Sequence, residues 1–283
     1  SGETFIGYSS SGGLSSHCTY EKAFMHATSE VCERDTLNIF WNCFIPPKKI
    51  NVDAEFSDNR LRTLYKRYGD QLKDVKLYYH KLEDVDFTVV TAIKIDKQLK
   101  KYSFLSGGGV GVTVEEAIEG AIGEFAQAEN NLKMVLYSPN WITSKGVNFL
   151  FNIPKDLDIR DMKLFYQIVP YYGYEENQEN LDWYMNDGGE IKLSQIKKKE
   201  KALFGEYNKK KNIEKILKSK DIDPIILDFT DRNLNQLKIL KVFIPELTPA
   251  YISSIPLKGH LRYSKYLNKT GHSEVNPDPI PYP

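Results

Sequence analysis

The sequence has no long apolar run and few cysteines. None of its hydrophobic stretches approaches the roughly 18 to 20 apolar residues that a membrane-spanning helix needs, and no signal peptide opens it. Its three cysteines, Cys18, Cys32 and Cys43, are an odd number without the spacing of a metal site. We therefore expect free thiols, no membrane contact and a cytoplasmic protein.

Net charge is absent as well. The 38 Lys and Arg residues balance the 38 Asp and Glu residues, so no overall electrostatic attraction to nucleic acid or to a membrane surface is expected. Length and composition are compatible with an ordinary globular protein. With 283 residues, 41% of them hydrophobic, the chain is long enough to bury a substantial core in one large domain.

One pattern occurs twice in the sequence. Segments 19–33 and 113–127 align at an offset of 94 residues, and Thr, Glu, two Ala and a second Glu coincide. The last position is Glu33 in the first copy and Gln127 in the second. Each copy follows a run of small residues, at 9–13 and 106–111. Matches in register behind two glycine runs indicate a true repeat.

The repeat predicts two helices that carry oxygen ligands. Residues three and four apart share a helix face, so each copy places two alanines and a glutamate on one stripe that a neighbour or ligand can approach closely. A buried carboxylate needs a positive partner, and oxygen ligands are those that Mg2+ prefers. The candidate metal ligands are Glu30, Glu33, Glu124 and Gln127.

The glycine runs are expected as loops that open the two helices. Free backbone N–H groups at a helix start bind phosphate. The candidate phosphate-binding residues are Gly12, Gly13, Gly107 and Gly108. Magnesium with a polyphosphate uses every part of the pattern. The alternative is that the alanines mark close helix–helix packing, with the glutamates solvated or paired to Arg34 or a lysine.

The remaining pattern predicts an α+β fold with mixed or antiparallel sheets and two equivalent ligand-bearing helices. The first helix should run from its cap at Thr19 to about Phe44 and the second to about 130–131, with a short helix capped by Ser57 between them. Strands are expected at 5–8, 75–79, 87–95, 102–105, 225–229 and 238–244. Strand 87–95 should be central, and one sheet should hold both ligand helices.

Three further segments have several interpretations. The aromatic stretch 139–195 fits a helical insertion, a lid or a partner surface. The lysine-rich stretch 197–220 fits a solvated helix face with a loop, or a docking patch for an acidic peptide, and contains a short predicted helix at 212–218. The tail, 277–283, has proline at every second position, which favours polyproline II. A disordered terminus and a docked, functional tail both stay open.

These motifs, in this order, resemble the YcaO family. The matching segments are the serine- and glycine-rich run at 9–19 followed by Glu30-x-x-Glu33-Arg34, the glycine run at 107–111 followed by Glu124-x-x-Gln127, the segments 227–230 and 242–247 with Gly259, and the proline-alternating tail. The resemblance spans essentially the whole chain, and an ordered set of four matches is specific.

The resemblance implies an ATP-dependent enzyme that acts on peptide backbone amides. In the family a nucleophile attacks the amide carbon, and phosphorylation of the amide oxygen makes that oxygen a leaving group. A Cys, Ser or Thr of a ribosomal precursor peptide gives a thiazoline or oxazoline ring, as in bacteriocin and microcin biosynthesis. Sulfide or an amine gives a thioamide or an amidine instead. The proline-ended tail is characteristic of the azoline-forming branch, in which the C-terminus reaches toward the active site.

Site residues and partners follow from the same resemblance. Carried over by position, the four candidate ligands would bind Mg2+ and the phosphates of ATP. The carboxylate of Pro283 and the imidazole of His17 are the candidates for proton transfer. The implied partners are a precursor peptide, a ThiF-like protein that binds the leader of that peptide, and a dehydrogenase. A homodimer is a further expectation.

Two departures from the family pattern matter. The family's earlier segment, with a glycine–lysine loop and a pair of helix glutamates, has no counterpart here, and Glu129 stands where arginine is common. Residues 1–283 are therefore predicted to form a single YcaO-like domain without that N-terminal segment. A catalytically silent subunit that binds nucleotide or a partner is the alternative from a different class.

Overall fold

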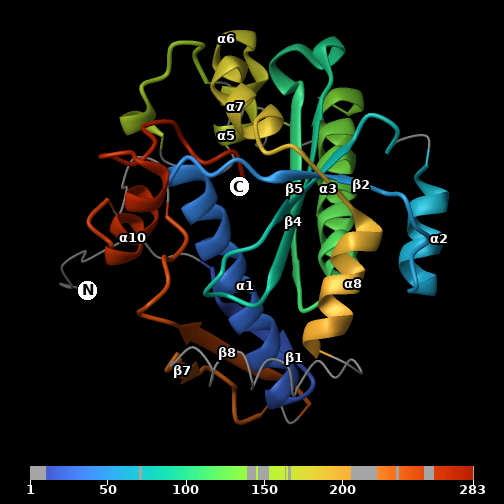
Figure 1. The fold of residues 1–283 in the computed structure, drawn as a ribbon, viewed down its shortest axis with the longest axis vertical. Helices are drawn as coiled ribbons and strands as arrows, with labels where there is room; N and C mark the ends of the chain where they lie inside the picture. Colours follow the sequence, from blue (N-terminus) through green and yellow to red (C-terminus); the bar gives the residue numbers. More distant parts are fainter. Residues whose placement is uncertain are drawn as a thin grey trace.

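Two sheets and two long helices organise the chain (Figure 1). The computed structural model describes residues 11–69, 72–138, 145, 153–162, 164, 167–204, 222–233, 236–251 and 258–282. One sheet has the strand order β1 (Leu14–His17), β8 (Lys238–Phe243), β7 (Ile225–Asp228). The other has the order β5 (Phe104–Gly111), β4 (Thr88–Ile95), β3 (Lys76–His80), β2 (Lys48–Asn51), β6 (Glu190–Lys192). Only β2 and β6 pair parallel among these strands, and the predicted α+β class with mixed sheets is confirmed.

The helices differ greatly in length. The two long ones are α1 (Tyr20–Asn42) and α3 (Val114–Tyr137). The shorter ones are α2 (Asn59–Arg67), α5 (Ile168–Gly173), α6 (Glu175–Gln178), α7 (Asp182–Asn186), α8 (Leu193–Phe204) and α10 (Leu261–Thr270), with 3-10 turns η1 (Lys97–Tyr102), η2 (Ile159–Asp161) and η4 (Glu179–Leu181). Within the described part of the chain, no helix has both the length and the apolar character needed to cross a bilayer. All three cysteines are free thiols, as predicted.

Both ligand helices begin where the repeat predicts. The Thr19 hydroxyl accepts a hydrogen bond from the backbone N–H of Lys22, and the Thr113 hydroxyl accepts one from that of Glu116, each at 3.3 Å. Such a cap satisfies an N–H group that the first helical turn leaves without a partner. The two copies therefore start with the same local structure.

The predicted helix ends were less accurate. The helix α1 stops two residues before Phe44, which takes a left-handed φ of 54°. The helix α3 continues past 131 to Tyr137, because Leu132 and Val135 extend its buried face. Burial of an apolar face prolongs a helix more effectively than the weak helix preference of two asparagines ends it.

The five-stranded sheet carries a helix on each face (Figure 1). The helix α3 packs on β4 and β5 from one side, and α1 packs on them from the other side. The helix α1 also covers one face of the three-stranded sheet. Two hydrophobic cores result, one around each helix. Since α1 lies between two sheets, Ala23 and Ala27 on its stripe are completely buried.

The second glycine run is a strand, where we predicted a loop. Residues 106–111 lie in β5, and α3 packs directly on the backbone of that strand. A Cβ on Gly107 would lie 2.3 Å from the backbone N of Phe125, and one on Gly109 would lie 2.2 Å from the backbone O of Ala117. These distances leave no room for a side chain. The alanine stripe of α3 therefore serves close packing, as the alternative interpretation held, although against a strand.

The first glycine run differs from the second. Gly12 and Gly13 form a turn, and β1 follows directly in the three-stranded sheet. The strands at the two glycine runs therefore belong to different sheets, because pairing between distant strands decides sheet membership. The five-stranded sheet nevertheless contacts both ligand helices, as predicted. The strand β4 is interior, but β3 is the central one. The cap of α2 is Asp58 rather than Ser57, since the Asp58 carboxylate accepts from the N–H of Arg60 at 2.7 Å.

The aromatic stretch forms short helices over its described part. The elements α5, α6, η4 and α7 follow one another, and α5 packs on η1 and β5. A helical insertion is the interpretation that agrees with this arrangement. The helix α8 holds the first part of the lysine-rich stretch. The rest of that stretch, the predicted helix at 212–218 and the predicted strand at 5–8 lie outside the described residues.

The contact between α3 and β5 predicts the effect of adding a single methyl group. Gly107→Ala should lower the free energy of unfolding by about 1–3 kcal/mol, because the new Cβ overlaps the helix backbone. The matched control is Gly123→Ala on α3, because a Cβ at position 123 meets nothing within 4 Å. This substitution should stabilise the protein by about 0.5–1 kcal/mol. Urea denaturation measures both values. Equal effects of the two substitutions would show that α3 does not sit on the strand backbone.

Candidate functional site

Two carboxylates from different helices meet at the middle glycine of β5. The backbone N–H of Gly108 donates to Glu124 Oε2 of α3 at 3.0 Å. From α1, Glu33 Oε1 lies 2.4 Å from the position that a Cβ on Gly108 would take. Any side chain at this position would collide with the Glu33 carboxylate. Glycine is therefore required at position 108 for the two glutamates to converge.

The first copy of the repeat makes the same hydrogen bond. The backbone N–H of Gly13 donates to Glu30 Oε2 at 3.1 Å, as that of Gly108 donates to Glu124. Gly13 has a φ of +76°, and a Cβ there would lie 2.4 Å from the backbone O of Val242. In each copy a helix glutamate thus folds back onto the glycine that precedes its own helix. The sequence repeat is a structural repeat of site geometry.

Burial and neighbouring carboxylates disfavour the charged form of Glu33. Burial is the main cause that raises the pKa of Glu33 to about 7; Arg34 opposes the shift, and the charges of Glu124 and Glu30 add to it. Burial is also the main cause that raises the pKa of Glu30, with Arg34, the Gly13 N–H and Lys241 acting in the opposite direction. The local positive charge is therefore insufficient to compensate the buried carboxylates. A bound cation would remove this deficit.

Two basic side chains flank the cluster. Arg34 follows Glu33 on α1, and its charge acts on both carboxylates of that helix. Lys241 comes from the middle of β8, donates to the backbone O of Gly12, and has a pKa lowered by burial. Lys241 was not among the site residues predicted from the sequence. A lysine in an otherwise apolar strand was the available signal, but nothing local shows that β8 lies beside Glu30.

The donor set fits a magnesium ion that is shared with a phosphate group. Among the described residues, no three His, Cys, Asp or Glu side chains form a complete metal cage. Mg2+ does not need one, because it retains waters and is bound by one or two carboxylates together with substrate phosphates. Glu33 and Glu124 supply such a pair, and Glu30 stands one turn before Glu33. Gln127 is exposed one turn beyond Glu124.

Other predicted site residues lie elsewhere. Gly107 faces α3 and belongs to the packing contact described above. His17 ends β1 on the side away from Gly13, where its ring stacks on His26 with centroids 5.6 Å apart. Its Nδ1 also lies 3.1 Å from Cys18 Sγ. Pro283 lies outside the described residues.

An apolar pocket opens beside the cluster. Its volume is about 460 Å3, and Gly12, Arg34 and Lys241 lie on its wall. The rest of the wall is mainly apolar and includes Phe243 and Ile244 of the β8 segment. A ligand with an apolar body and an anionic end fits this combination, because two cations lie on a mainly apolar wall.

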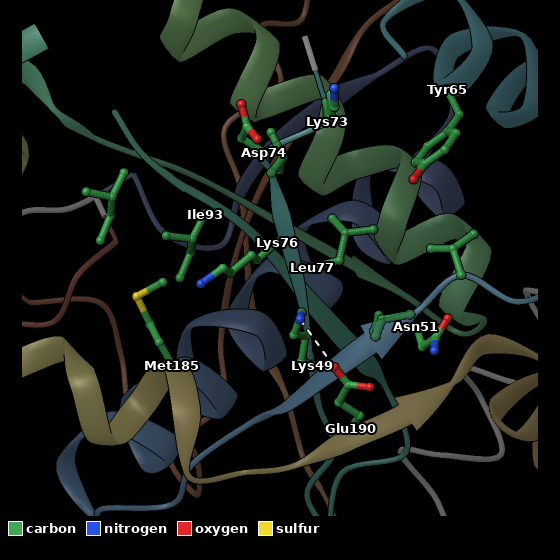
Figure 2. A pocket seen from close by; sticks show the side chains of 14 residues that line it. Lys49, Asn51, Tyr65, Lys73, Asp74, Lys76, Leu77, Ile93, Met185 and Glu190 are labelled. Carbon is green, nitrogen blue, oxygen red and sulfur yellow. Dashed lines mark hydrogen bonds and ion pairs between the residues drawn. The ribbon is translucent and has the colours of Figure 1, made fainter. Parts of the chain in front are cut away.

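A second pocket, of about 680 Å3, is lined by other residues than the glutamate site (Figure 2). The pocket opens where β2, after pairing with β3 at two positions, pairs with β6 instead. Its polar wall includes Lys73, Lys76 and the ion pair of Lys49 with Glu190 at 3.2 Å (Figure 2). None of the predicted site residues lines it.

The C-terminal tail is docked in the protein interior (Figure 1). Side-chain donors bind its backbone carbonyls: Trp41 Nε1 donates to Asp278 O at 2.8 Å, the Tyr172 hydroxyl to Pro279 O, and Ser106 Oγ to Pro281 O at 3.2 Å. The alternate prolines have no N–H to satisfy, so the tail needs few partners besides these donors. Of the two open interpretations, the docked tail is the one observed.

The end of the tail lies next to the strand that receives the carboxylates. The Tyr282 hydroxyl lies 3.1 Å from Thr91 Oγ1, and Tyr282 is only 3% exposed. Thr91 is the cross-strand partner of Gly108 in the pair β4 and β5. Ser106, which binds Pro281, is two residues from Gly108 on the same strand. The described tail thus ends beside the place where Glu33 and Glu124 meet.

A family model described as "YcaO cyclodehydratase, ATP-ad Mg2+-binding" matches residues 1–248. No curated protein sequence matches the chain. Among solved structures, YcaO from Methanopyrus kandleri bound with AMPPCP and Mg2+ is 18% identical with a TM-score of 0.53, and the match covers 85% of this chain and 57% of that one.

Two further solved structures resemble the fold. A heterocyclase in complex with substrate and cofactor is 14% identical with a TM-score of 0.63, covering 98% of this chain and 34% of that chain. The E. coli microcin synthetase McbBCD complex with pro-MccB17 bound is 13% identical with a TM-score of 0.59, covering 97% and 63%. The chain therefore spans between about one third and just under two thirds of these structures, and at such identities the likeness concerns the fold.

The raised pKa of Glu33 predicts a pH-dependent stability. The folded protein holds the Glu33 proton up to about pH 7, whereas the unfolded chain releases it near the ordinary value of 4.5. The free energy of unfolding should therefore fall as pH rises through this window, by on the order of 1–3 kcal/mol. Glu33→Gln should lack this fall and be more stable than wild type at about pH 8. Urea denaturation without divalent cations measures it.

The control for this experiment is Glu246→Gln, at an exposed position after β8. It should keep the wild-type dependence of stability on pH. If Glu33→Gln also kept that dependence, Glu33 would not be the buried carboxylate that the structure shows.

Proposed function

Because this chain belongs to the YcaO family, we propose that it catalyses ATP-dependent cyclodehydration of peptide backbone amides. The products are thiazoline or oxazoline rings made from Cys, Ser or Thr of a ribosomally made precursor peptide. The observation that carries the proposal is the convergence of Glu33 and Glu124 at Gly108, beside the docked end of the tail. The site joins an acidic cluster, flanking cations and an adjacent pocket, which suits Mg2+ and a nucleotide.

In this proposal the carboxylates bind the metal ion. Glu30, Glu33 and Glu124 would hold the metal, with Gln127 one turn beyond, and the metal supplies neutralisation of phosphate charge when bound. Carboxylates alone would repel the phosphates of ATP. The Gly13 and Gly108 N–H groups orient two of these carboxylates. Arg34 and Lys241 place positive charge on the wall of the neighbouring pocket, where the phosphates of a nucleotide would benefit from it.

The proposed chemistry balances without any further reactant. The substrate Sγ or Oγ gives its proton to a base and attacks the preceding carbonyl carbon, and the carbonyl oxygen takes the γ-phosphoryl group of ATP, leaving ADP. Loss of phosphate from carbon and of the amide proton then gives the C=N bond of the ring. The peptide loses the elements of one water per ring, and its oxygen leaves in the phosphate.

The reaction needs a base that accepts the protons released by the nucleophile and by the amide nitrogen. The docked tail supports the C-terminal carboxylate of Pro283 as the candidate, because the tail approaches the carboxylate site up to Tyr282. His17 receives less support, since it stacks on His26 at the other end of β1.

Partners form part of the proposal. A precursor peptide, a ThiF-like leader-binding protein and a dehydrogenase would work with this chain, and the likeness to a multi-subunit microcin synthetase supports an assembly. The three-stranded sheet offers an exposed apolar face for such contacts, because Ile225 stands opposite Phe243, and Leu14 and Leu227 flank Lys241. Exposed apolar patches of this kind are typical of interaction surfaces.

A second candidate is a catalytically silent subunit that binds nucleotide or a partner. Glu129 favours it, because Glu129 stands at a position where arginine is common in the family and pairs with Lys133 at 2.9 Å. Thioamide or amidine formation is the alternative within the enzyme class, and the mass of the product separates it from ring formation.

The function is tested with ATP, Mg2+, a cognate Cys-, Ser- or Thr-rich peptide and the leader-binding partner. Mass spectrometry should show loss of one water per ring, with matching ATP consumption. Glu30→Ala should reduce the rate at least about 100-fold, the typical effect of losing an electrostatic stabiliser. The matched control, Glu119→Ala, removes an α3 carboxylate that faces Arg60 instead of the cluster, and should retain activity.

Two outcomes would reject ring formation by this chain. One is an unchanged peptide mass with wild-type protein in the full complex, and the other is full activity of Glu30→Ala. Nucleotide binding by calorimetry without turnover would support the silent subunit instead.

A further inference from the structure

A row of buried polar groups connects the tail to the centre of the five-stranded sheet. His80 Nε2 of β3 lies 2.7 Å from the Tyr184 hydroxyl of α7. That hydroxyl lies 3.2 Å from the Tyr282 hydroxyl of the tail, which in turn lies 3.1 Å from Thr91 Oγ1 of β4. Four segments that are distant in the sequence thus share one hydrogen-bonded row.

Every member of the row is shielded from water. His80, Tyr184 and Thr91 have no exposed surface, and Tyr282 is 3% exposed. A buried hydroxyl or imidazole is costly unless it has a hydrogen-bond partner. Displacing Tyr282 would leave the Thr91 hydroxyl without a partner in the row, and the Tyr184 hydroxyl with His80 as its one remaining partner there. The row therefore favours one position of the tail end over others.

His80 serves in this row as a neutral group. Complete burial lowers the pKa of His80 to about 3, so the imidazole is uncharged at physiological pH. The ring is also held by Phe40, whose ring stands edge-on with centroids 4.9 Å apart. Among the described residues, the side chains of Tyr184 and Phe40 and the backbone of Val89 and Tyr78 face His80, and none of these groups carries a charge. A fixed, uncharged imidazole suits positioning rather than proton uptake.

The row ends at the carboxylate site. Thr91 is the direct cross-strand partner of Gly108, the glycine at which Glu33 and Glu124 meet. Ser106 on the same strand binds the carbonyl of Pro281, one residue before Tyr282. The two strand residues hold adjacent tail positions, and within the described part of the chain His80 reaches the tail through Tyr184.

We propose that His80 and Tyr184 are positioning residues that hold the end of the tail against the carboxylate site. Neither touches the carboxylates, and both act through Tyr282 and Thr91. This fixation of the tail end, called the hold below, depends on the structure alone. Its consequence for turnover rests on the proposed function.

The hold is tested by hydrogen exchange of the tail, read by mass spectrometry in the full-length protein. Between 277 and 282 only Asp278, Ile280 and Tyr282 have amide protons. His80→Leu and Tyr184→Phe should speed their exchange at least about tenfold, the effect of leaving a buried hydroxyl without its partner. His80→Gln, whose amide reaches the position of Nε2, should restore slow exchange.

Tyr78→Phe is the matched control. Tyr78 lies on β3 two residues before His80, is completely buried, and its hydroxyl has no hydrogen-bond partner among the described residues. Removing that hydroxyl should leave tail exchange unchanged. Wild-type exchange in Tyr184→Phe, a variant that loses only one oxygen atom, would overturn the proposal. So would equal acceleration in Tyr78→Phe.

Turnover tests the consequence for catalysis. With peptide, ATP and the partner present, His80→Leu and Tyr184→Phe should lower kcat about tenfold while KM for ATP changes less than about twofold. His80→Gln should recover most of kcat. A rise in KM for ATP at unchanged kcat would overturn the positioning role. If wild-type protein turns over no peptide, the proposed function fails, and the exchange measurements still decide the hold.

Discussion

Close approach of two helices to a strand without side chains is the constraint on which this structure depends. Gly107 and Gly109 of β5 admit the backbone of α3, and Gly108, pointing the other way, admits the carboxylate of Glu33 from α1. Since side chains alternate across a strand, three consecutive glycines serve both faces at once. The same N–H that a longer side chain would obstruct orients Glu124. The packing of α3 and the geometry of the carboxylate site therefore both require glycine at these three positions of β5.

The site carries an electrostatic cost that the rest of the fold must offset. Burial raises the pKa of Glu33 to about 7, so its charged form destabilises the folded protein at neutral pH. Two residues further along α1, Asp35 is buried and paired: Arg262 of α10 binds both of its oxygens, at 2.8 and 2.6 Å, and the Thr248 N–H donates to it at 2.8 Å. This network fixes α1 against α10 while the glutamates stay poorly compensated. Such an imbalance is what a cation-binding site requires.

The tail completes the interior instead of leaving it. It follows α10, passes Trp41 and Tyr172, and ends on Thr91. Alternating proline limits the conformations of the free tail, so docking costs it little entropy. The aromatic stretch that had several interpretations supplies Tyr172 and Tyr184, both fully buried against the tail. The enrichment in aromatic residues thus reflects the need for donors that pack well and still bond carbonyl or hydroxyl oxygens.

The sequence by itself determined the features that depend on spacing along one element. The offset of 94 residues located both ligand helices, their threonine caps marked where they begin, and the strands were largely recognised from β-branched residues. Glu30, Glu33 and Glu124 were identified because helical periodicity relates them to the alanine stripe. The proline-alternating tail was visible, but its docking was not.

Only the tertiary structure decided which elements meet. It placed β1 and β5, the strands at the two glycine runs, in different sheets, turned a predicted glycine loop into the strand β5, and brought Lys241 beside Glu30. It also joined Tyr282 to Thr91, 191 residues earlier in the chain. Local periodicity relates residues a few positions apart, whereas contacts between distant segments follow from strand pairing and core packing, which no single segment specifies.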